Sequence, residues 1–175
     1  RFLKMNNVSL YIHWPWCLVK CPYCDFNSHI NKEEIKESDM IRSYQKDILY
    51  FNNLIGKNKI KSVFFGGGTP SLMSPNICDK ILRKIKYYWP FKTDIEISLE
   101  VNPRDVSHNL MRQYKDIGIN RISIGAQSFS DNDLKFLGRD HDAIDSIKSI
   151  EIVQKYFPNF SFDLISTLPN ATLLS

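Results

Sequence analysis

The chain has 175 residues, with 23 Lys and Arg against 19 Asp and Glu, which gives a net charge of +4. Hydrophobic residues make up 43% of the sequence and charged residues 24%, as in a globular domain with one sizeable core. The charges are dispersed except at 57–61, which we interpret as a solvated turn before a strand. No apolar run reaches membrane-spanning length. The composition therefore favours neither a nucleic-acid-binding protein nor one with a transmembrane segment.

The first predicted strand, 8–13, ends at a Trp-Pro pair and leads into a segment that holds three of the four cysteines, Cys17, Cys21 and Cys24. Few cysteines and no secretory signal predict free thiols in a cytoplasmic setting and disfavour a disulfide framework. Three thiolates on one loop can bind three irons of a cubane cluster, which leaves the fourth iron open to a chelating molecule. Zinc held with His13 or His29 is the alternative.

Helices and strands alternate along the rest of the chain. Apolar residues at helical spacing predict helices at 41–55, 75–85, 110–117 and 142–153, and short apolar or alternating runs predict strands at 62–65, 94–101, 120–127 and 160–165. Cys78, on the second helix, is expected to be a small buried hydrophobe. The predicted helix caps are Ser38 or Asp39, Ser74, a capping box of Ser130 and Asp133 over a short turn, and Asp142.

Five strands that alternate with helices indicate an α/β fold with a parallel sheet of right-handed βαβ units. An open doubly wound sheet and a barrel both fit this order, and the strand faces favour a curled, open barrel. One face of each of four strands is apolar, while the other is polar, namely Tyr11 and His13; Glu96, Ser98, Glu100 and Asn102; Ser123, Gly125 and Gln127; and Ser161 and Asp163. A solvated antiparallel sheet is the alternative, which connections of helix length disfavour.

The polar faces of such a barrel converge on one interior. Unpaired polar groups there would cost about 1–3 kcal/mol each, so water or a polar ligand is expected to fill the lumen. Ligands of parallel barrels lie at the carboxyl ends of the strands. Both the cysteine segment and the run Gly66-Gly67-Gly68-Thr69-Pro70 follow strand ends, so we expect them on the same rim. The glycines alone are a weak signal, compatible with a tight turn or with close approach to a ligand.

Longer stretches of the chain resemble one family. The Cys-x3-Cys-x2-Cys spacing is that of radical S-adenosylmethionine (radical SAM) enzymes, and the glycine run resembles their "GGE-like" motif. Residues 11–17, 21–29, 65–72, 100–103, 122–129 and 137–139 resemble the HemW-type radical SAM haem chaperones, relatives of the oxygen-independent coproporphyrinogen III oxidases. The resemblance covers nearly the whole chain. It implies an incomplete (β/α)6 partial TIM barrel with about five parallel strands, a radical SAM core domain over residues 1–175 that is truncated, and an absent C-terminal domain.

The resemblance also implies the cofactors and their ligands. A [4Fe–4S] cluster would be bound by Cys17, Cys21 and Cys24, and its open iron by the amino and carboxylate groups of S-adenosylmethionine. The positions that match S-adenosylmethionine contacts in the related oxidase are Tyr11, Tyr23, Gly67, Gly68, Thr69, Glu100, Gln127, Arg139 and Asp163. The spacing of Asp163 departs slightly from the family's pattern. Several of these residues also belong to the polar strand faces predicted from alternation.

Three functions remain open at this point. The first, which we favour, is a haem chaperone that binds haem, hands it to an acceptor protein and draws on an electron donor for its cluster. The second is an oxygen-independent coproporphyrinogen III oxidase, and the third is an inactive truncated fragment. The resemblance disfavours the oxidase, because oxidase relatives carry a further cysteine two positions after the third cluster cysteine, where this chain has Phe26. The haem ligand is not assigned, since His13, His29, His108 and His141 qualify by residue type alone.

Overall fold

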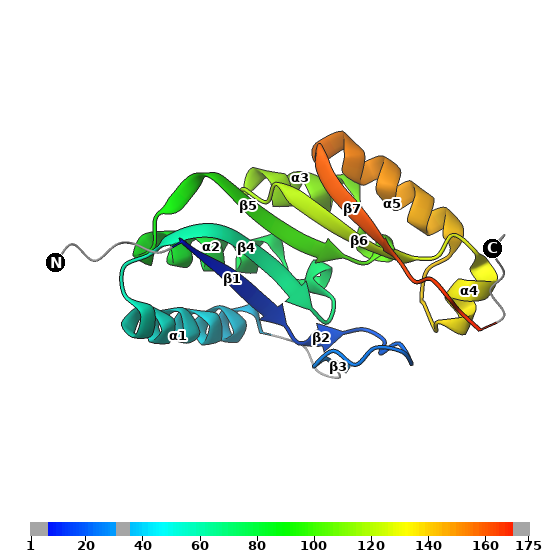
Figure 1. The fold of residues 1–175 in the computed structure, drawn as a ribbon, viewed down its shortest axis with the longest axis horizontal. Helices are drawn as coiled ribbons and strands as arrows, with labels where there is room; N and C mark the ends of the chain where they lie inside the picture. Colours follow the sequence, from blue (N-terminus) through cyan, green and yellow to red (C-terminus); the bar gives the residue numbers. More distant parts are fainter. Residues whose placement is uncertain (1–6, 31–35, 170–175) are drawn as a thin grey trace.

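The computed structural model describes residues 7–30 and 36–169. Its main sheet has five strands in the order β1-β4-β5-β6-β7, and every neighbouring pair is parallel (Figure 1). The strands are β1 (Asn7–Trp14), β4 (Lys59–Gly67), β5 (Phe91–Val101), β6 (Arg121–Gln127) and β7 (Asn159–Leu164). Two further short strands, β2 (Trp16–Cys17) and β3 (His29–Ile30), pair with each other at the two ends of the cysteine segment.

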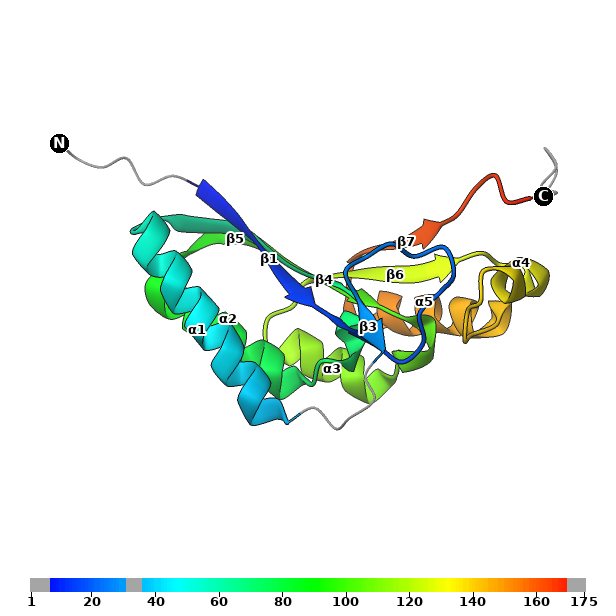
Figure 2. The ribbon, with the colours of Figure 1, turned by 90° about the horizontal axis from the view of Figure 1, so that it is seen from below.

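Helices connect the strands and cover one face of the sheet. They are α1 (Glu37–Ile55), α2 (Pro75–Tyr88), α3 (His108–Asp116), α4 (Asp131–Phe136) and α5 (Ala143–Tyr156), with short 3-10 turns η1 (Pro70–Leu72) and η2 (Pro103–Asp105). Figure 2 shows α1, α2, α3 and α5 below a curved sheet whose other face has no helix over it. The predicted incomplete parallel α/β barrel with five strands is therefore confirmed.

Most helix starts follow the predicted capping chemistry. Ser74 accepts a hydrogen bond from the amide of Ile77, and Asp142 forms a full capping box with Asp145. Ser130 caps α4, but its box lacks the reciprocal arm, because the Asp133 carboxylate accepts from the hydroxyl of Ser128 instead.

The predicted start of the first helix is wrong. Helix α1 begins at Glu37, so Ser38 and Asp39 lie inside its first turn rather than at the cap. Lys36 is at the cap position and makes no side-chain capping bond. Both predicted cap residues still suit the first turn of a helix, where a carboxylate such as that of Asp39 interacts favourably with the helix dipole.

The core lies between the sheet and the helices. Strand residues Val63, Phe65, Leu99, Ile122 and Ile124 are fully buried there against apolar side chains of the helices. Burial of each such side chain stabilises the fold by roughly 1.5–3 kcal/mol. Helix α2 contributes Ile77, Cys78, Ile81, Leu82 and Ile85 to this core, so the interpretation of Cys78 as a buried hydrophobe is confirmed.

The barrel is open between its first and last strands. Among the described residues no strand pairs with the outer edge of β1 or of β7. The apolar side chains of β7 are also covered less than its pattern predicted, since Phe162 remains 41% exposed and Leu164 54% exposed. The polar side chains of the inner face remain free to define a cavity.

Candidate functional site

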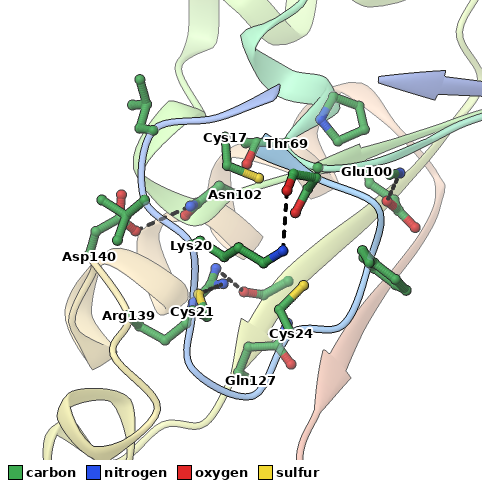
Figure 3. A pocket seen from close by; sticks show the side chains of 18 of the residues that line it. Cys17, Lys20, Cys21, Cys24, Thr69, Glu100, Asn102, Gln127, Arg139 and Asp140 are labelled. Carbon is green, nitrogen blue, oxygen red and sulfur yellow. Dashed lines mark hydrogen bonds between the residues drawn. The ribbon is translucent and has the colours of Figure 1, made fainter. Parts of the chain in front are cut away.

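A cavity of about 360 Å³ lies at the carboxyl ends of the strands, between the cysteine segment and the inner face of the sheet. All three clustered cysteines, Cys17, Cys21 and Cys24, line it (Figure 3). The opposite walls come from the exits of β4, β5, β6 and β7 and from the turn after α4. The expectation that the cysteine segment and the glycine run share one rim is thus confirmed.

The cysteine segment is a closed loop. Its ends are held by the β2–β3 pair and by a backbone bond of 2.7 Å from His29 N–H to the Pro15 carbonyl. Inside the loop, the amide of Cys24 donates to the carbonyl of Cys21 over 3.1 Å. The Nζ of Lys20 donates over 3.2 Å to the carbonyl of Ser28, which links two distant points of the loop. The fold therefore fixes the thiols on one short, braced segment.

Gly67 and Gly68 form a cradle against the chain that enters this loop. The amide of Gly68 donates to the Trp14 carbonyl over 2.6 Å, and that of Thr69 to the Trp16 carbonyl over 2.9 Å. A Cβ on Gly68 would lie 2.6 Å from the Trp16 oxygen and 2.9 Å from the Cys17 Sγ. Gly67 has φ +118°, a conformation that favours glycine. The glycines thus allow close approach within the protein itself, a possibility beside the tight turn and the approach to a ligand that the sequence left open.

The carboxylate of Glu100, at the end of β5, bonds to this cradle. Its Oε2 accepts a hydrogen bond of 3.2 Å from the amide of Gly67. Burial raises the pKa of Glu100, an effect that the Gly67 bond partly offsets and the negative charge of Asp163 reinforces. A carboxylate held at a cavity wall in this way suits a cationic group of a ligand.

Polar side chains of the inner face bond to one another, from Ser123 and Asp163 in the cavity lining to residues beyond it. The Asp163 carboxylate accepts from the Ser123 hydroxyl over 3.4 Å, and Ser123 and Ser161 lie 3.2 Å apart. Arg121 donates to Ser161 over 2.8 Å and to Ser98 over 3.5 Å. The predicted polar lumen is confirmed, but the part beyond the lining satisfies its hydrogen bonds largely from within the protein.

Arg139, on the turn between α4 and α5, reaches the cysteine loop from the far side. Its Nη1 lies 3.4 Å from both the Cys21 Sγ and the Tyr23 hydroxyl, and its Nη2 donates over 3.2 Å to the Gly125 carbonyl. Burial raises the pKa of Tyr23, and the positive charge of Arg139 partly offsets this rise. The site therefore offers a carboxylate on one wall and a guanidinium on another.

The structure brings together nearly all the residues that the sequence proposed. The cavity is lined by Cys17, Cys21, Tyr23, Cys24, Gly67, Gly68, Thr69, Glu100, Gln127, Arg139 and Asp163. Tyr11 is the exception, since it lies beside this cavity rather than in its lining. Its ring stacks on Phe64 and packs over Gly66, and burial followed by the charge of Glu100 raises its pKa. Tyr11 is thus a neighbour of Glu100 at the edge of the site.

Several lining residues were not singled out from the sequence as site residues. Lys20, Ser28, Asn102, Asp105 and Asp140 all face the cavity. Asn102 had a detectable signal, since it continues the polar alternation of β5. Ser28 and Asp140 had none, because their positions depend on how the loops fold back over the sheet.

The donor set fits an iron–sulfur cluster that keeps one iron open. In a cubane cluster each cysteine thiolate binds a different iron, so the three sulfurs need not converge on one point. In residues 7–30 and 36–169, no three Cys, His, Asp or Glu side chains meet in a group that would hold a single metal ion. Buried polar atoms at the rim, the Ser28 hydroxyl and the Arg139 Nε, lack a protein partner in this part of the chain. Cys78 differs, because burial raises the pKa of its thiol and disfavours the thiolate.

The fold and the site together define a cofactor-binding protein on a partial parallel barrel, with its chemistry at the strand exits. Comparison with protein families gives a match to the Radical SAM superfamily over residues 11–173. The chain belongs to the Radical SAM superfamily.

Curated relatives include proteins named Heme chaperone HemW. The chain is 43% identical to that of Haemophilus influenzae over 97% of its own length and 46% of the relative. It is 38% identical to that of Escherichia coli, over 98% of its own length and 46% of the relative. It is also 38% identical to "Radical S-adenosyl methionine domain-containing protein 1, mitochondrial" of Bos taurus, over 94% of its own length and 37% of the relative. The chain therefore spans less than half of the length of these relatives.

Solved structures show the same fold. Coproporphyrinogen III oxidase (HemN) from Escherichia coli matches with a TM-score of 0.85 and 25% identity, over 98% of this chain and 40% of that one. The structure titled "Native anSMEcpe with bound AdoMet and Cp18Cys peptide" matches with a TM-score of 0.58 at 15% identity, over 92% of this chain and 42% of that one, which is a likeness of fold alone. No helix in the described ranges is long and apolar enough to cross a membrane.

Proposed function

We propose that this chain is the radical SAM core of a haem chaperone, which binds a [4Fe–4S] cluster and S-adenosylmethionine. The observation that carries the proposal is the convergence of three thiols from one loop with the glycine cradle and the strand exits on a single cavity. The curated relatives named Heme chaperone HemW support the chaperone part.

Each side chain has a role that follows from its chemistry. Cys17, Cys21 and Cys24 would hold three irons of the cluster. Glu100, with Gly67, offers a negative end for the ammonium group of S-adenosylmethionine, and Arg139 a positive end for its carboxylate. With a reduced cluster, bound S-adenosylmethionine supplies a 5′-deoxyadenosyl radical and methionine; the protein supplies orientation and excludes water.

The remaining proposed contacts follow from place in the cavity. Thr69 and Gly68 lie beside Cys17, and Gln127 and Asp163 lie on the inner wall, where an adenosine would find polar partners. Tyr23 places an aromatic ring next to Cys24, while Tyr11 would act from the edge of the site through its neighbour Glu100.

The wider setting is part of the proposal. We take residues 1–175 as the core domain of a longer protein that binds haem and passes it to an acceptor protein, while an electron donor reduces the cluster. Four free cysteines in the structure suit a cytoplasmic, reducing compartment.

The likeness of fold to the Escherichia coli oxidase favours a second candidate, oxidative decarboxylation of coproporphyrinogen. Phe26 argues against it. Its ring lines the cavity at the position where the resemblance places an additional cysteine in the oxidases. A phenyl group cannot take the place of a thiol in redox or hydrogen transfer, so we expect no such turnover.

Anaerobic loading with iron and sulfide tests the core of the proposal. We expect about four irons per chain and a change in the electron paramagnetic resonance spectrum of the reduced cluster when S-adenosylmethionine is added. Tight zinc binding without iron uptake would overturn the cluster assignment.

A second assay separates the two functions. Coproporphyrinogen, a reductant and S-adenosylmethionine are supplied to the loaded chain and to its full-length form, and products are analysed for protoporphyrinogen. We expect none from either, and weak or no haem binding by the 175-residue chain that improves in the full-length protein. Protoporphyrinogen formed by the full-length protein would move the assignment to the oxidase.

A further inference from the structure

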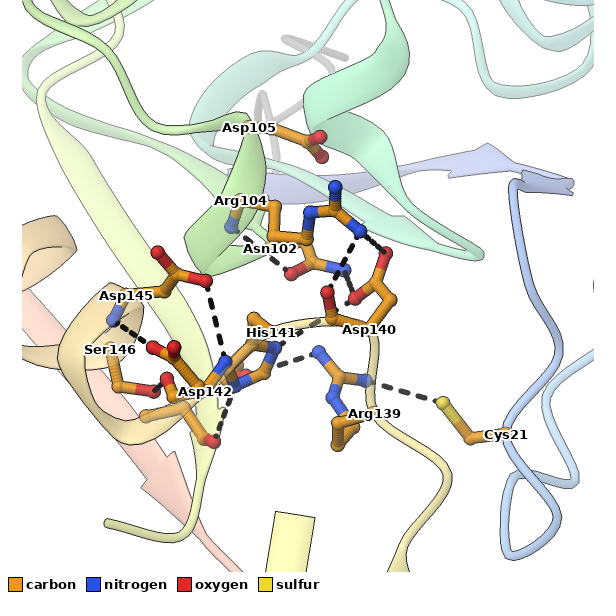
Figure 4. Close-up of polar contacts among 12 residues, drawn as sticks. Cys21, Asn102, Arg104, Asp105, Arg139, Asp140, His141, Asp142, Asp145 and Ser146 are labelled. Carbon is orange, nitrogen blue, oxygen red and sulfur yellow. Dashed lines mark hydrogen bonds and ion pairs between the residues drawn. The ribbon is translucent and has the colours of Figure 1, made fainter. Parts of the chain in front are cut away.

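The turn between α4 and α5 carries three consecutive side chains, each tied to a different part of the site (Figure 4). Arg139 reaches the cysteine loop and the exit of β6. Asp140 reaches the exit of β5, and His141 reaches the end of β6. Because neighbouring residues point to different walls, a shift at any one of the three displaces the other two.

Asp140 is the member that binds the segment after β5. Its Oδ1 accepts from the Asn102 Nδ2 over 3.2 Å, and its backbone carbonyl accepts from the Arg104 Nη1 over 2.9 Å. The Arg104 Nη1 also lies 4.0 Å from the Asp140 Oδ2. These contacts attach the turn to the segment that follows β5. Strand β5 itself carries Glu100 near its end.

His141 fixes the other side of the same turn. Its side chain is fully buried, and its Nε2 lies 3.1 Å from the Ala126 carbonyl, immediately before Gln127. Its Nδ1 has no hydrogen-bond partner in the described part of the chain and lies 3.8 Å from the Asp140 Oδ1. The turn is therefore attached to the segment after β5 through Asp140 and to β6 through His141.

Arg139 is held more loosely by the cysteine loop than by β6, where its Nη2 donates over 3.2 Å to the Gly125 carbonyl. Its bonds to the Cys21 Sγ and the Tyr23 hydroxyl are 3.4 Å long, and no carboxylate among the described residues forms an ion pair with it. The positive charge thus stays available for a ligand. On the side of the cysteine loop, Gly138 allows close packing, since a Cβ at this position would lie 2.7 Å from the Pro22 Cδ.

We infer that Asp140 is a positioning residue, which holds Arg139 at the cavity wall so that its guanidinium can bind the carboxylate of S-adenosylmethionine. The inference rests on the proposed binding of S-adenosylmethionine and deepens it. Asp140 lines the cavity, but its carboxylate accepts from Asn102 and faces Arg104, and it acts on Arg139 through the backbone of the turn. It touches neither substrate nor cluster in this role.

The test compares matched variants of the chain loaded with iron and sulfide. Asp140→Ala removes the bond to Asn102 and should weaken binding of S-adenosylmethionine about tenfold or more, as loss of an orienting partner commonly does. Asp140→Asn keeps an oxygen acceptor toward Asn102 and loses only the contact with exposed Arg104, so its affinity should fall less than about fivefold. Affinity is measured by equilibrium dialysis.

Asp142→Ala is the structural control. It removes the capping box of α5 two residues further on, which lowers the denaturation midpoint but leaves the contacts of Arg139 and Asp140 in place. Its affinity for S-adenosylmethionine should equal that of the wild type. An equal loss of affinity in Asp142→Ala and Asp140→Ala would show that general destabilisation is the cause and overturn the inference.

A double-mutant cycle decides whether Asp140 acts through Arg139. In an Arg139→Leu background, Asp140→Ala should have no further effect on affinity, whereas two independent residues would give additive losses. Additive losses would overturn the inference. If Asp140→Ala does not fold, Asn102→Ala removes the same bond from the β5 side and takes its place in the cycle. A wild-type chain that takes up its cluster but does not bind S-adenosylmethionine would instead refute the proposed function, and the inference with it.

Discussion

The Gly68→Ala substitution is the sharpest probe of how the glycine run supports the cysteine loop. A methyl group at this position would lie 2.6 Å from the Trp16 carbonyl oxygen and 2.9 Å from the Cys17 Sγ. The oxygen belongs to the backbone, so it cannot rotate away as the end of a flexible side chain would. The strand exit that carries Trp16 and Cys17 must move instead.

The size of this movement follows from the distances. Since real Cβ contacts are rarely shorter than 3.4 Å, the difference from 2.6 Å requires a shift of about 0.8 Å. Such a shift strains the bonds that Gly68 and Thr69 donate to the carbonyls of Trp14 and Trp16. Overpacking of this kind typically costs about 1–3 kcal/mol. It also displaces one of the three thiols relative to the other two.

Two measurements separate stability from cluster loading. Urea denaturation should show a loss of free energy of unfolding within that range, and anaerobic iron loading should give a marked drop in iron bound per chain. Gly118→Ala is the matched control, because Gly118 has φ +100° but no atom within 4 Å of the added methyl group. That variant should lose about 1 kcal/mol through backbone strain and keep full iron content.

Full iron loading in Gly68→Ala, together with unchanged stability, would refute the reasoning. It would mean that the strand exit yields without cost and that the cradle does not set the place of Cys17. Loss of bound iron in Gly118→Ala would also refute the reasoning, because it would show that any loss of stability, and not the position of Cys17, lowers the iron content.

Two further predictions concern the thiols and the buried carboxylate. Ala at Cys17, Cys21 or Cys24 should each abolish most of the broad absorbance near about 400 nm after iron and sulfide loading, whereas Ala at the buried Cys78 should retain it; equal loss in all four would contradict the assignment. Burial raises the pKa of Glu100 in the folded chain, so the folded state holds this proton more tightly than the unfolded state does. Its contribution to stability is therefore greatest at low pH and is lost as pH rises from the ordinary value of 4.5 through the raised pKa; Glu100→Gln should flatten the dependence of unfolding free energy on pH in that range, and an unchanged slope would contradict this.

Much of the fold was accessible from local patterns. Alternation along β5 separates Ile97 and Leu99, which are buried in the core, from Ser98 and Glu100 on the inner face, and the structure follows that division. Strand ends were less accessible, because β4 extends over Lys59–Gly67, well beyond its apolar run, through backbone pairing with β1 and β5. Pairing of this kind depends on partners distant in sequence and leaves little trace in composition.

The site divides in the same way. The spacing of the cysteines is a local signal, and it identified the loop. The brace from Lys20 to the Ser28 carbonyl and the anchor of Asp140 on Asn102 join residues 8 and 38 positions apart. Such contacts arise only after the chain has folded. The predicted start of the first helix was wrong, and the contacts there are also tertiary. Glu37, the first residue of α1, accepts a hydrogen bond on its carboxylate from Asn76 of α2, a contact that no capping rule contains.

Two of the five buried side-chain polar atoms that lack a partner in the described residues belong to residues of the cavity lining. In the deeper lumen, Arg121 bonds to Ser161 and Ser98, so that region persists without a ligand. At the rim, the Ser28 hydroxyl and the Arg139 Nε are buried with no partner in the described residues. Unsatisfied buried groups cost about 1–3 kcal/mol each, and a fold keeps them where function demands. A ligand that supplies those bonds binds only the folded chain, and it therefore stabilises the rim at the same time as it completes the site.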